Sequence, residues 1–123
     1  MRIFKLKAFA RWARKEQIDD NVLIEAVKEM QRGLIDAQLG GSLYKKRIPA
    51  SSRGKRGGAR TIVAFQSNKN TFFIFGFLKN ESSNIDQVEL RAVRQYAQHL
   101  LALQDNQIAS LLKKEELYQV ESP

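Results

Sequence analysis

The chain has 123 residues, of which 43% are hydrophobic and 28% charged, a composition typical of one soluble globular domain. It contains no cysteine, which excludes disulfide bonds and thiolate metal sites and fits a reducing cytosol, and no apolar run approaches the roughly 20 residues of a membrane helix. A net charge of +8, from 21 Lys and Arg against 13 Asp and Glu, favours an anionic partner.

The N-terminal part of the chain predicts a strand followed by two helices. Residues 2–6 alternate polar and apolar side chains, which is typical of a short edge strand. Apolar residues then follow helical spacing as far as Lys15, and Trp12 at this spacing is typical of a core residue. A second helix is predicted from an N-cap at Asp19 and Asp20 to Gly33, with one apolar stripe made of Val22, Leu23, Ala26, Val27 and Met30.

The middle of the chain predicts a connector and three strands. Residues 34–41 are expected to form a connector closed by a glycine pair, and residues 43–48 a strand that Pro49 ends. Residues 59–66 and 71–78 predict a hairpin with its turn at 67–70. The second strand is apolar on both faces, with Phe73, Phe75 and Phe77 alternating with Phe72, Ile74 and Leu78, so we expect it to be buried in the middle of the sheet.

The C-terminal part predicts a longer helix, a shorter one and a last strand. Asp86 and Glu89 form a capping box for the first helix, whose apolar face is made of Leu90, Val93, Ala97, Leu100 and Leu101. His99 lies beside that face, and a structural role is expected for it. A short helix after Asp105 and a strand over residues 117–120 complete the chain. The pattern predicts one domain of helices and strands over residues 1–123.

Seven basic residues and no acidic one occur between positions 45 and 60: Lys45, Lys46, Arg47, Arg53, Lys55, Arg56 and Arg60. Because the other 14 Lys and Arg residues nearly balance the 13 acidic ones, most of the net charge lies in this segment. Three glycines in the same segment allow a close backbone approach and let successive N–H groups point at an anion. The ligand that we expect is the phosphate of a nucleic acid.

Other kinds of chemistry have little support in the sequence. One histidine and no cysteine argue against a metal centre, and we predict neither a metal nor a cofactor. Both the glycine-flanked nucleophile turn of a serine hydrolase and the spacing of a P-loop are missing. A cluster of Lys and Arg near one carboxylate, Glu81, is able to cleave RNA without a metal, because a lysine among cations favours its neutral form and an arginine fork matches phosphate oxygens. From the residues alone, a nucleic-acid binder and a ribonuclease both stay open.

Two motifs resemble one known family. The run Gly54-Lys55-Arg56-Gly57-Gly58-Ala59-Arg60, followed by an aromatic strand that ends in Lys79-Asn80-Glu81, is similar to the HigB branch of the RelE/ParE toxins of bacterial type II toxin–antitoxin systems. The resemblance covers about residues 1–104, which makes residues 105–123 a C-terminal extension, and it implies an α+β fold. It implies a small antiparallel sheet with two N-terminal helices and a closing C-terminal helix, and cleavage of messenger RNA on the ribosome.

Residue by residue, the resemblance makes Lys55, Arg56, Arg60, Lys79 and Glu81 the catalytic group, with Arg60 binding the phosphate. No residue near the C-terminus matches the catalytic histidine or tyrosine of some relatives, so the general acid is not assigned. RNA binding is predicted for Tyr44, Lys45, Lys46, Arg47, Arg53 and Asn80.

The expected partners are messenger RNA, the ribosome and a cognate antitoxin with a helix-turn-helix domain, in the cytoplasm and without a membrane. Two alternatives stay open: a ParE-like poison of DNA gyrase, which would use the basic face for binding alone, and a non-enzymatic nucleic-acid-binding module.

The hairpin also predicts a specific geometry. The start of one strand lies beside the end of the next, so Arg60 should meet residues 79–81 at one rim of the sheet.

Overall fold

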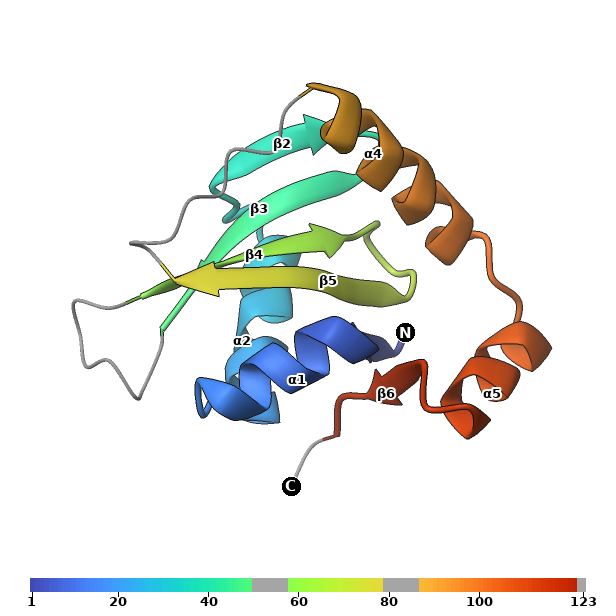
Figure 1. Ribbon diagram of the computed structural model, residues 1–123. Helices are drawn as coiled ribbons and strands as arrows, with labels where there is room; N and C mark the ends of the chain where they lie inside the picture. The colour runs from blue at the N-terminus through green and yellow to red at the C-terminus, as the bar shows by residue number, and fades with distance from the viewer. Residues whose placement is uncertain (50–57, 79–86, 122–123) are drawn as a thin grey trace.

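The computed structural model describes residues 1–49, 58–78 and 87–121, and Figure 1 shows their arrangement. In chain order the elements are β1 (Ile3–Leu6), α1 (Lys7–Lys15), α2 (Asp20–Gln31), β2 (Ala37–Gly40), β3 (Leu43–Ile48), β4 (Ala59–Ala64), β5 (Thr71–Leu78), α4 (Gln87–Leu101), α5 (Asp105–Lys113) and β6 (Leu117–Gln119). No helix in these described ranges combines the length and the apolar content needed to cross a membrane.

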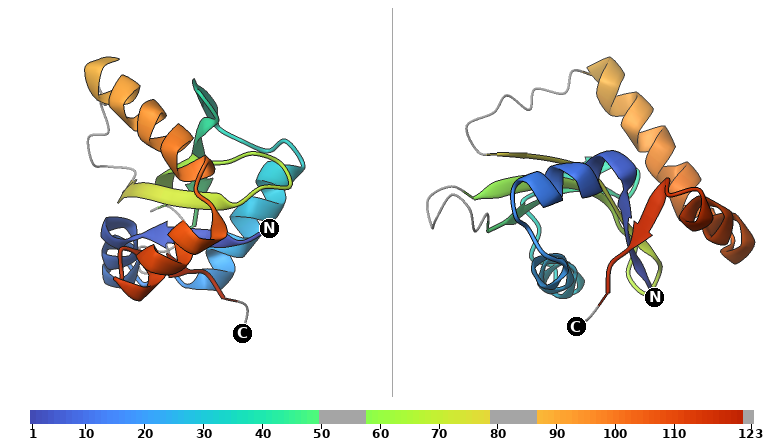
Figure 2. Two further views of the ribbon diagram at one scale, coloured as in Figure 1. Left: turned by 90° about the vertical axis from the view of Figure 1, so that its right-hand side faces the viewer. Right: turned by 60° about the horizontal axis from the view of Figure 1, so that its bottom comes forward.

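The strands form one six-stranded sheet in the order β2-β3-β4-β5-β1-β6. All neighbouring pairs are antiparallel except β1 and β5, which run parallel. Helices cover both faces, and the left view of Figure 2 shows α2 and α4 on opposite sides of the sheet. We call these the α2 face, which also carries α1, and the α4 face, which also carries α5. The predicted α+β class with a mainly antiparallel sheet is confirmed.

Each face of the sheet has its own hydrophobic core. The α2 face buries Phe9, Leu23, Val27, Met30, Val63 and Phe73 against the two N-terminal helices. The α4 face buries Phe4, Leu43, Ile62, Phe72, Leu100 and Ile108. Burying an aliphatic or aromatic side chain of this kind stabilises the fold by about 1.5–3 kcal/mol, so these two layers hold the helices to the sheet.

Local signals position the two N-terminal helices as predicted. The carboxylate of Asp19 accepts a hydrogen bond from the backbone N–H of Val22, which caps α2. The helix ends before Gly33, whose φ of +88° suits glycine. Trp12 on α1 packs against the core of the α2 face, and its ring lies so close to Gly76 that a Cβ atom there would be 2.2 Å from it. The core role predicted for Trp12 is therefore confirmed.

Two of the predicted strand assignments are wrong. β1 is not an edge strand, because it pairs with β5 on one side and β6 on the other. Its alternating polar residue, Lys5, faces Asp20 of α2 with the two charged groups 2.8 Å apart, so an ion pair rather than solvent satisfies it. The connector predicted over residues 34–41 contains β2, a four-residue edge strand that pairs with β3 across a β-bulge. A strand this short gives no clear alternation.

A β-bulge in β5 changes which phenylalanines share a face. Val63 pairs with Phe73 while its neighbour Ile62 pairs with Phe75, so Ile74 is an extra residue on β5. Beyond the bulge the alternation is displaced by one residue. Phe73 packs on the α2 face but Phe77 packs on the α4 face, and the predicted grouping of Phe73, Phe75 and Phe77 is wrong. The interior position predicted for β5 is confirmed, although Phe75 is 43% exposed rather than buried.

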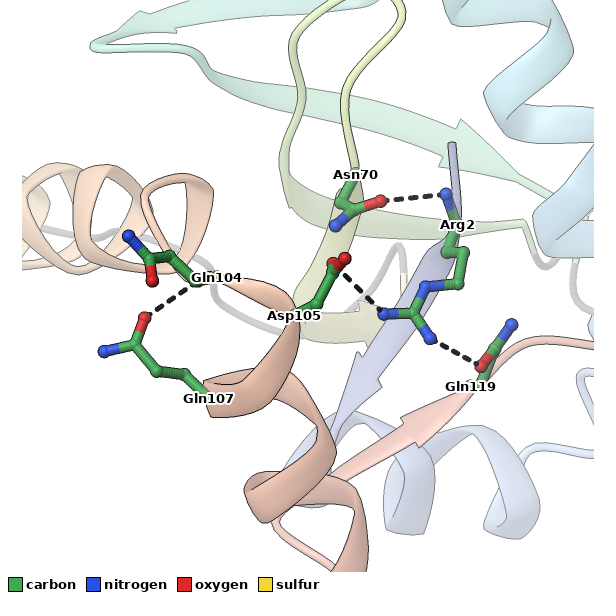
Figure 3. Close-up of polar contacts among 6 residues, drawn as sticks. All are labelled: Arg2, Asn70, Gln104, Asp105, Gln107 and Gln119. Carbon is green, nitrogen blue, oxygen red and sulfur yellow. Dashed lines mark hydrogen bonds and ion pairs between the residues drawn. The ribbon is translucent and has the colours of Figure 1, made fainter.

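The predicted C-terminal helices and last strand are confirmed, with α5 and β6 packed onto the sheet. β6 pairs with β1, and Ile108 and Leu117 are fully buried. Figure 3 shows Arg2 linking these parts: its backbone N–H donates to Asn70, and its guanidinium group lies 3.5 Å from Gln119 and 3.8 Å from Asp105. Asp86, the predicted cap of α4, lies outside the described residues.

His99 differs from its prediction. Its imidazole is exposed, and it stacks on Tyr96 with the ring centroids 6.4 Å apart. It therefore projects from the outer side of α4 instead of supporting the apolar face.

Candidate nucleic-acid interface

A row of two arginines and a phenylalanine crosses three strands of the sheet. Arg47 on β3 lies directly opposite Arg60 on β4, and Arg60 lies opposite Phe77 on β5. The next row on this side contains Lys45, Ile62 and Phe75 in the same order. Side chains of directly opposed residues project from the same face, and Ile62 places this face as the one that packs against α4.

The row lies at the end of the sheet where β3 and β5 finish and β4 begins (Figure 1). Pro49 follows β3 and cannot extend the ladder, whereas Gly58 precedes β4 with a φ of +39°. A Cβ atom on Gly58 would be 3.7 Å from the Nη1 atom of Arg60. The guanidinium group therefore lies close to the backbone at the start of β4, where a small residue leaves room beside it.

The charges in this region are of one sign. We call Lys45, Arg47 and Arg60 the basic cluster. None of its members belongs to any of the four ion pairs found among the described residues. Like charges placed directly opposite each other across a sheet destabilise it, and an anion bound between them would remove that repulsion. Two guanidinium forks side by side offer several N–H donors in the planar geometry that fits phosphate oxygens.

The structure separates two of the predicted RNA-binding residues from the basic cluster. Lys46 projects to the α2 face, where it is buried: its Nζ atom lies 2.7 Å from Oε1 of Glu29 and donates to the carbonyl of Leu34 at 2.9 Å. The hydrogen bond that Lys46 donates to the Glu29 carboxylate, together with the lysine's charge, holds the pKa of that carboxyl below its usual value. Tyr44 also points to the α2 face and packs edge-on against Phe65. Both predictions are corrected, because a strand sends alternate side chains to opposite faces.

The remaining predicted residues lie outside the part of the chain that the structure describes. They are Arg53, Lys55, Arg56, Lys79, Asn80 and Glu81. The expected meeting of Arg60 with residues 79–81 therefore stays a prediction. Of the predicted catalytic and binding residues, the structure brings together Lys45, Arg47 and Arg60.

Phe75 and Phe77 lie on the same face as the basic cluster and were not predicted as site residues. The alternation of β5 places them in the core, and only the bulge at Ile74 turns them to the face that carries Arg60. One signal for irregular pairing was present: Gly76 lies inside the strand, and an internal glycine indicates a bulge or a close approach. In this chain both features occur between residues 74 and 76: the bulge at Ile74 and the close approach of the Trp12 ring to Gly76.

The chain is a small α+β domain with a row of cationic side chains at one end of a mainly antiparallel sheet. The comparison with protein families makes the assignment specific. Residues 1–120 match the family described as RelE toxin of the RelE/RelB toxin–antitoxin system, and the chain belongs to this family. It is thus the toxin of a toxin–antitoxin system and has a cognate antitoxin as its partner. A comparison with curated proteins gave no match.

The matched range also bears on the C-terminal residues. It extends through α5 and β6, both of which lie beyond the residues 1–104 that the sequence motifs covered.

Proposed function

We propose that this toxin is an endoribonuclease that cleaves messenger RNA on the ribosome without a metal. The observation that carries the proposal is the cross-strand pair of Arg47 and Arg60, which has no carboxylate partner among the described residues and faces the same side as Lys45. If Arg47 and Arg60 had a structural role, each would be expected to form an ion pair with a carboxylate. A phosphate-binding role requires that they stay available.

The chemistry that fits this cluster is attack by the ribose 2′-hydroxyl on the adjacent phosphorus. The new bond joins the 2′-oxygen to phosphorus, and the bond from phosphorus to the 5′-oxygen breaks. The products are a 2′,3′-cyclic phosphate and a new 5′-hydroxyl. A base takes the 2′-hydroxyl proton, an acid protonates the 5′-oxygen, and cations stabilise the crowded phosphorane between them.

Within this reaction, Arg60 is proposed to hold the phosphorane oxygens with its guanidinium fork, and Arg47 to share the charge. Proton transfer is proposed for the group formed by Lys55, Arg56, Lys79 and Glu81, in which a lysine among cations has its neutral form favoured. Lys45, Arg53 and Asn80 are proposed to position the RNA strand.

The antitoxin is proposed to carry a helix-turn-helix domain and to present acidic side chains to this basic face, because complementary charge favours association. The resemblance to the HigB branch supports an antitoxin with a helix-turn-helix domain. Because the proposed substrate is messenger RNA on ribosomes, we propose that the toxin acts in the cytoplasm.

One experiment separates the proposed activity from gyrase poisoning. The purified chain is added to translating ribosomes and, separately, to DNA gyrase with supercoiled DNA. We expect cuts in the ribosome-bound message and no change in supercoiling. Altered supercoiling with intact message would instead assign the basic face to gyrase. Binding of RNA without any cleavage would leave a non-enzymatic module.

A further inference from the structure

A hollow of about 380 Å³ opens on the α4 face. It lies between β5, α4, α5 and the first residues of α1, which are seen together in Figure 1. Aliphatic side chains of Ile74, Leu100 and Leu111 line it, and Phe75 and Tyr96 contribute aromatic rings. Its volume is within the range of about 300–1,000 Å³ that small planar ligands occupy in proteins.

The aromatic rings of Phe75 and Tyr96 are more exposed than the side chains of core residues. Phe75 and Tyr96 are each 43% exposed, and among the described aromatic side chains only these two rank as exposed large hydrophobic residues. Phe75 points to this face because of the bulge at Ile74, which is a local irregularity kept in the middle of an interior strand. Such bulges re-aim side chains at functional places.

Cations lie near the rings on two sides, and one carboxylate, that of Glu116, also lines the hollow. Phe75 lies opposite Ile62, and Arg60 is two residues from Ile62 on the same face of β4, which makes Arg60 a diagonal neighbour at about 7–8 Å. On the far side, Lys7 lines the hollow at the start of α1. Aromatic rings between cations are the arrangement by which proteins hold single-stranded nucleic acid, since phosphates contact the cations and bases stack on the rings.

We propose that this hollow is a subsite for one unstacked base of single-stranded RNA, with the phosphate of the neighbouring nucleotide held by Arg47 and Arg60. The proposal rests on the proposed function and adds to it a place where the enzyme holds a base rather than the backbone. Phe75 provides the stacking surface, Phe77 extends it toward Arg60, and Tyr96 borders the base from α4.

The hydroxyl group of Tyr96 is suited to hydrogen bonding with the edge of a base. Burial raises its pKa, and the nearby charge of Glu116 adds to this, so the hydroxyl keeps its proton at neutral pH and is able to donate as well as accept a hydrogen bond. The antitoxin is the other occupant to consider for an apolar hollow. A nucleotide matches both features, because its base fits the apolar hollow and its phosphate fits the nearby cations, and measuring antitoxin binding beside RNA binding separates the two occupants.

The test compares two RNA probes. One is a labelled single-stranded hexanucleotide, and the other is an abasic ribose-phosphate strand of the same length and charge. Dissociation constants at low salt are measured for the wild-type chain, Phe75→Leu, Phe75→Tyr and the control Leu34→Ala, which changes an exposed apolar residue outside the hollow. Thermal melts confirm that each variant is folded.

We expect Phe75→Leu to weaken binding of the hexanucleotide by about 5- to 150-fold, which is the range for losing one stacked base. The same variant should bind the abasic strand as the wild type does, Phe75→Tyr should keep the affinity, and Leu34→Ala should change neither. Equal affinities of wild type and Phe75→Leu for the hexanucleotide would overturn the subsite while leaving the cleavage proposal intact. So would a Phe75→Leu variant that keeps RNA affinity but loses the antitoxin. A wild-type chain that binds neither strand would contradict the proposed function itself.

Discussion

Arg47 on β3 and Arg60 on β4 are directly opposed in the sheet, and both project from the face that packs against α4. Directly opposed charges of one sign cost stability. Lys5 and Lys46, which form ion pairs with Asp20 and Glu29, project from the other face. Arg47 and Arg60 belong to none of the ion pairs found among the described residues.

The first prediction concerns Arg47. Arg47→Gln should leave the melting temperature unchanged or raise it, because it removes repulsion from Arg60. The same variant should weaken RNA binding and lower the slope of log K against log salt by about 0.7, which is the value for one lost contact to a single strand. Lys69→Gln is the matched control, since it removes a cation from the turn between β4 and β5, at the opposite end of β4. An Arg47→Gln variant that melts lower and keeps the full salt slope would make this residue structural.

The second prediction concerns the buried pair of Lys46 and Glu29. Glu29→Gln should lower the free energy of unfolding at pH 7 by about 1–2 kcal/mol, a moderate value because the carboxylate side is 41% exposed. The folded pKa of Glu29 is lowered, so the stability from its charge is present above the ordinary value of 4.5 and is lost as the pH falls through the folded value.

Urea titrations at pH 7 and at about pH 3 test this sign. The difference between wild type and Glu29→Gln should shrink at the lower pH, because the contribution of the Glu29 charge is lost as the pH falls through its folded pKa. A difference of the same size at both pH values would show that the charge contributes nothing. RNA affinity should stay unchanged in this variant.

The third prediction concerns the contact between Trp12 and Gly76. A Cβ atom at position 76 would lie 2.2 Å from the Trp12 ring, so Gly76→Ala should destabilise the fold by about 1–3 kcal/mol through overpacking. Trp12→Leu loses buried ring surface. In the Trp12→Leu background, however, the added methyl group of Gly76→Ala should lower the stability less than it does in the wild type. A double-mutant cycle by chemical denaturation measures this coupling. Strictly additive effects would mean that the two residues do not constrain each other.

Local signals were sufficient to predict much of this fold. Asp19 caps α2, Gly33 follows its end and Pro49 follows β3, and in each case the residue acts on its own backbone neighbours. The basic segment was likewise visible as a run of charge, and the predicted hairpin of β4 and β5 is present.

The rest depends on residues far apart in the chain. Lys46 is buried because Glu29 from α2 and the carbonyl of Leu34 meet it, which no pattern within β3 indicates. The face that Phe75 and Phe77 occupy depends on how β5 pairs with β4 across the bulge. A register shift of one residue reverses every later side chain, so period-two alternation alone assigned them wrongly.

The fourth prediction concerns the C-terminal elements. Deleting residues 105–123 removes the fully buried side chains of Ile108 and Leu117 together with the pairing of β6 to β1. The lost burial corresponds to about 3–6 kcal/mol, a large part of the roughly 5–15 kcal/mol that stabilises a typical domain. We therefore expect a chain that unfolds at a much lower urea concentration. Arg2→Ala, which breaks only the partly exposed contacts of Figure 3, should cost less than about 1 kcal/mol. A truncated chain as stable as the full one would show that α5 and β6 are dispensable.

The account depends most directly on Arg60. If its guanidinium fork stabilises the phosphorane, Arg60→Ala should lower the rate of message cleavage by about 10²–10³ while the protein stays folded. Arg60→Lys should restore little, because a single ammonium group cannot replace two parallel N–H donors. The decisive measurement determines the melting temperature and the cleavage rate of ribosome-bound message on the same sample of each variant. We predict a melting temperature near that of the wild type with cleavage reduced at least 100-fold, consistent with the cost of losing one such group. A folded Arg60→Ala protein that cleaves at the wild-type rate would contradict the assignment.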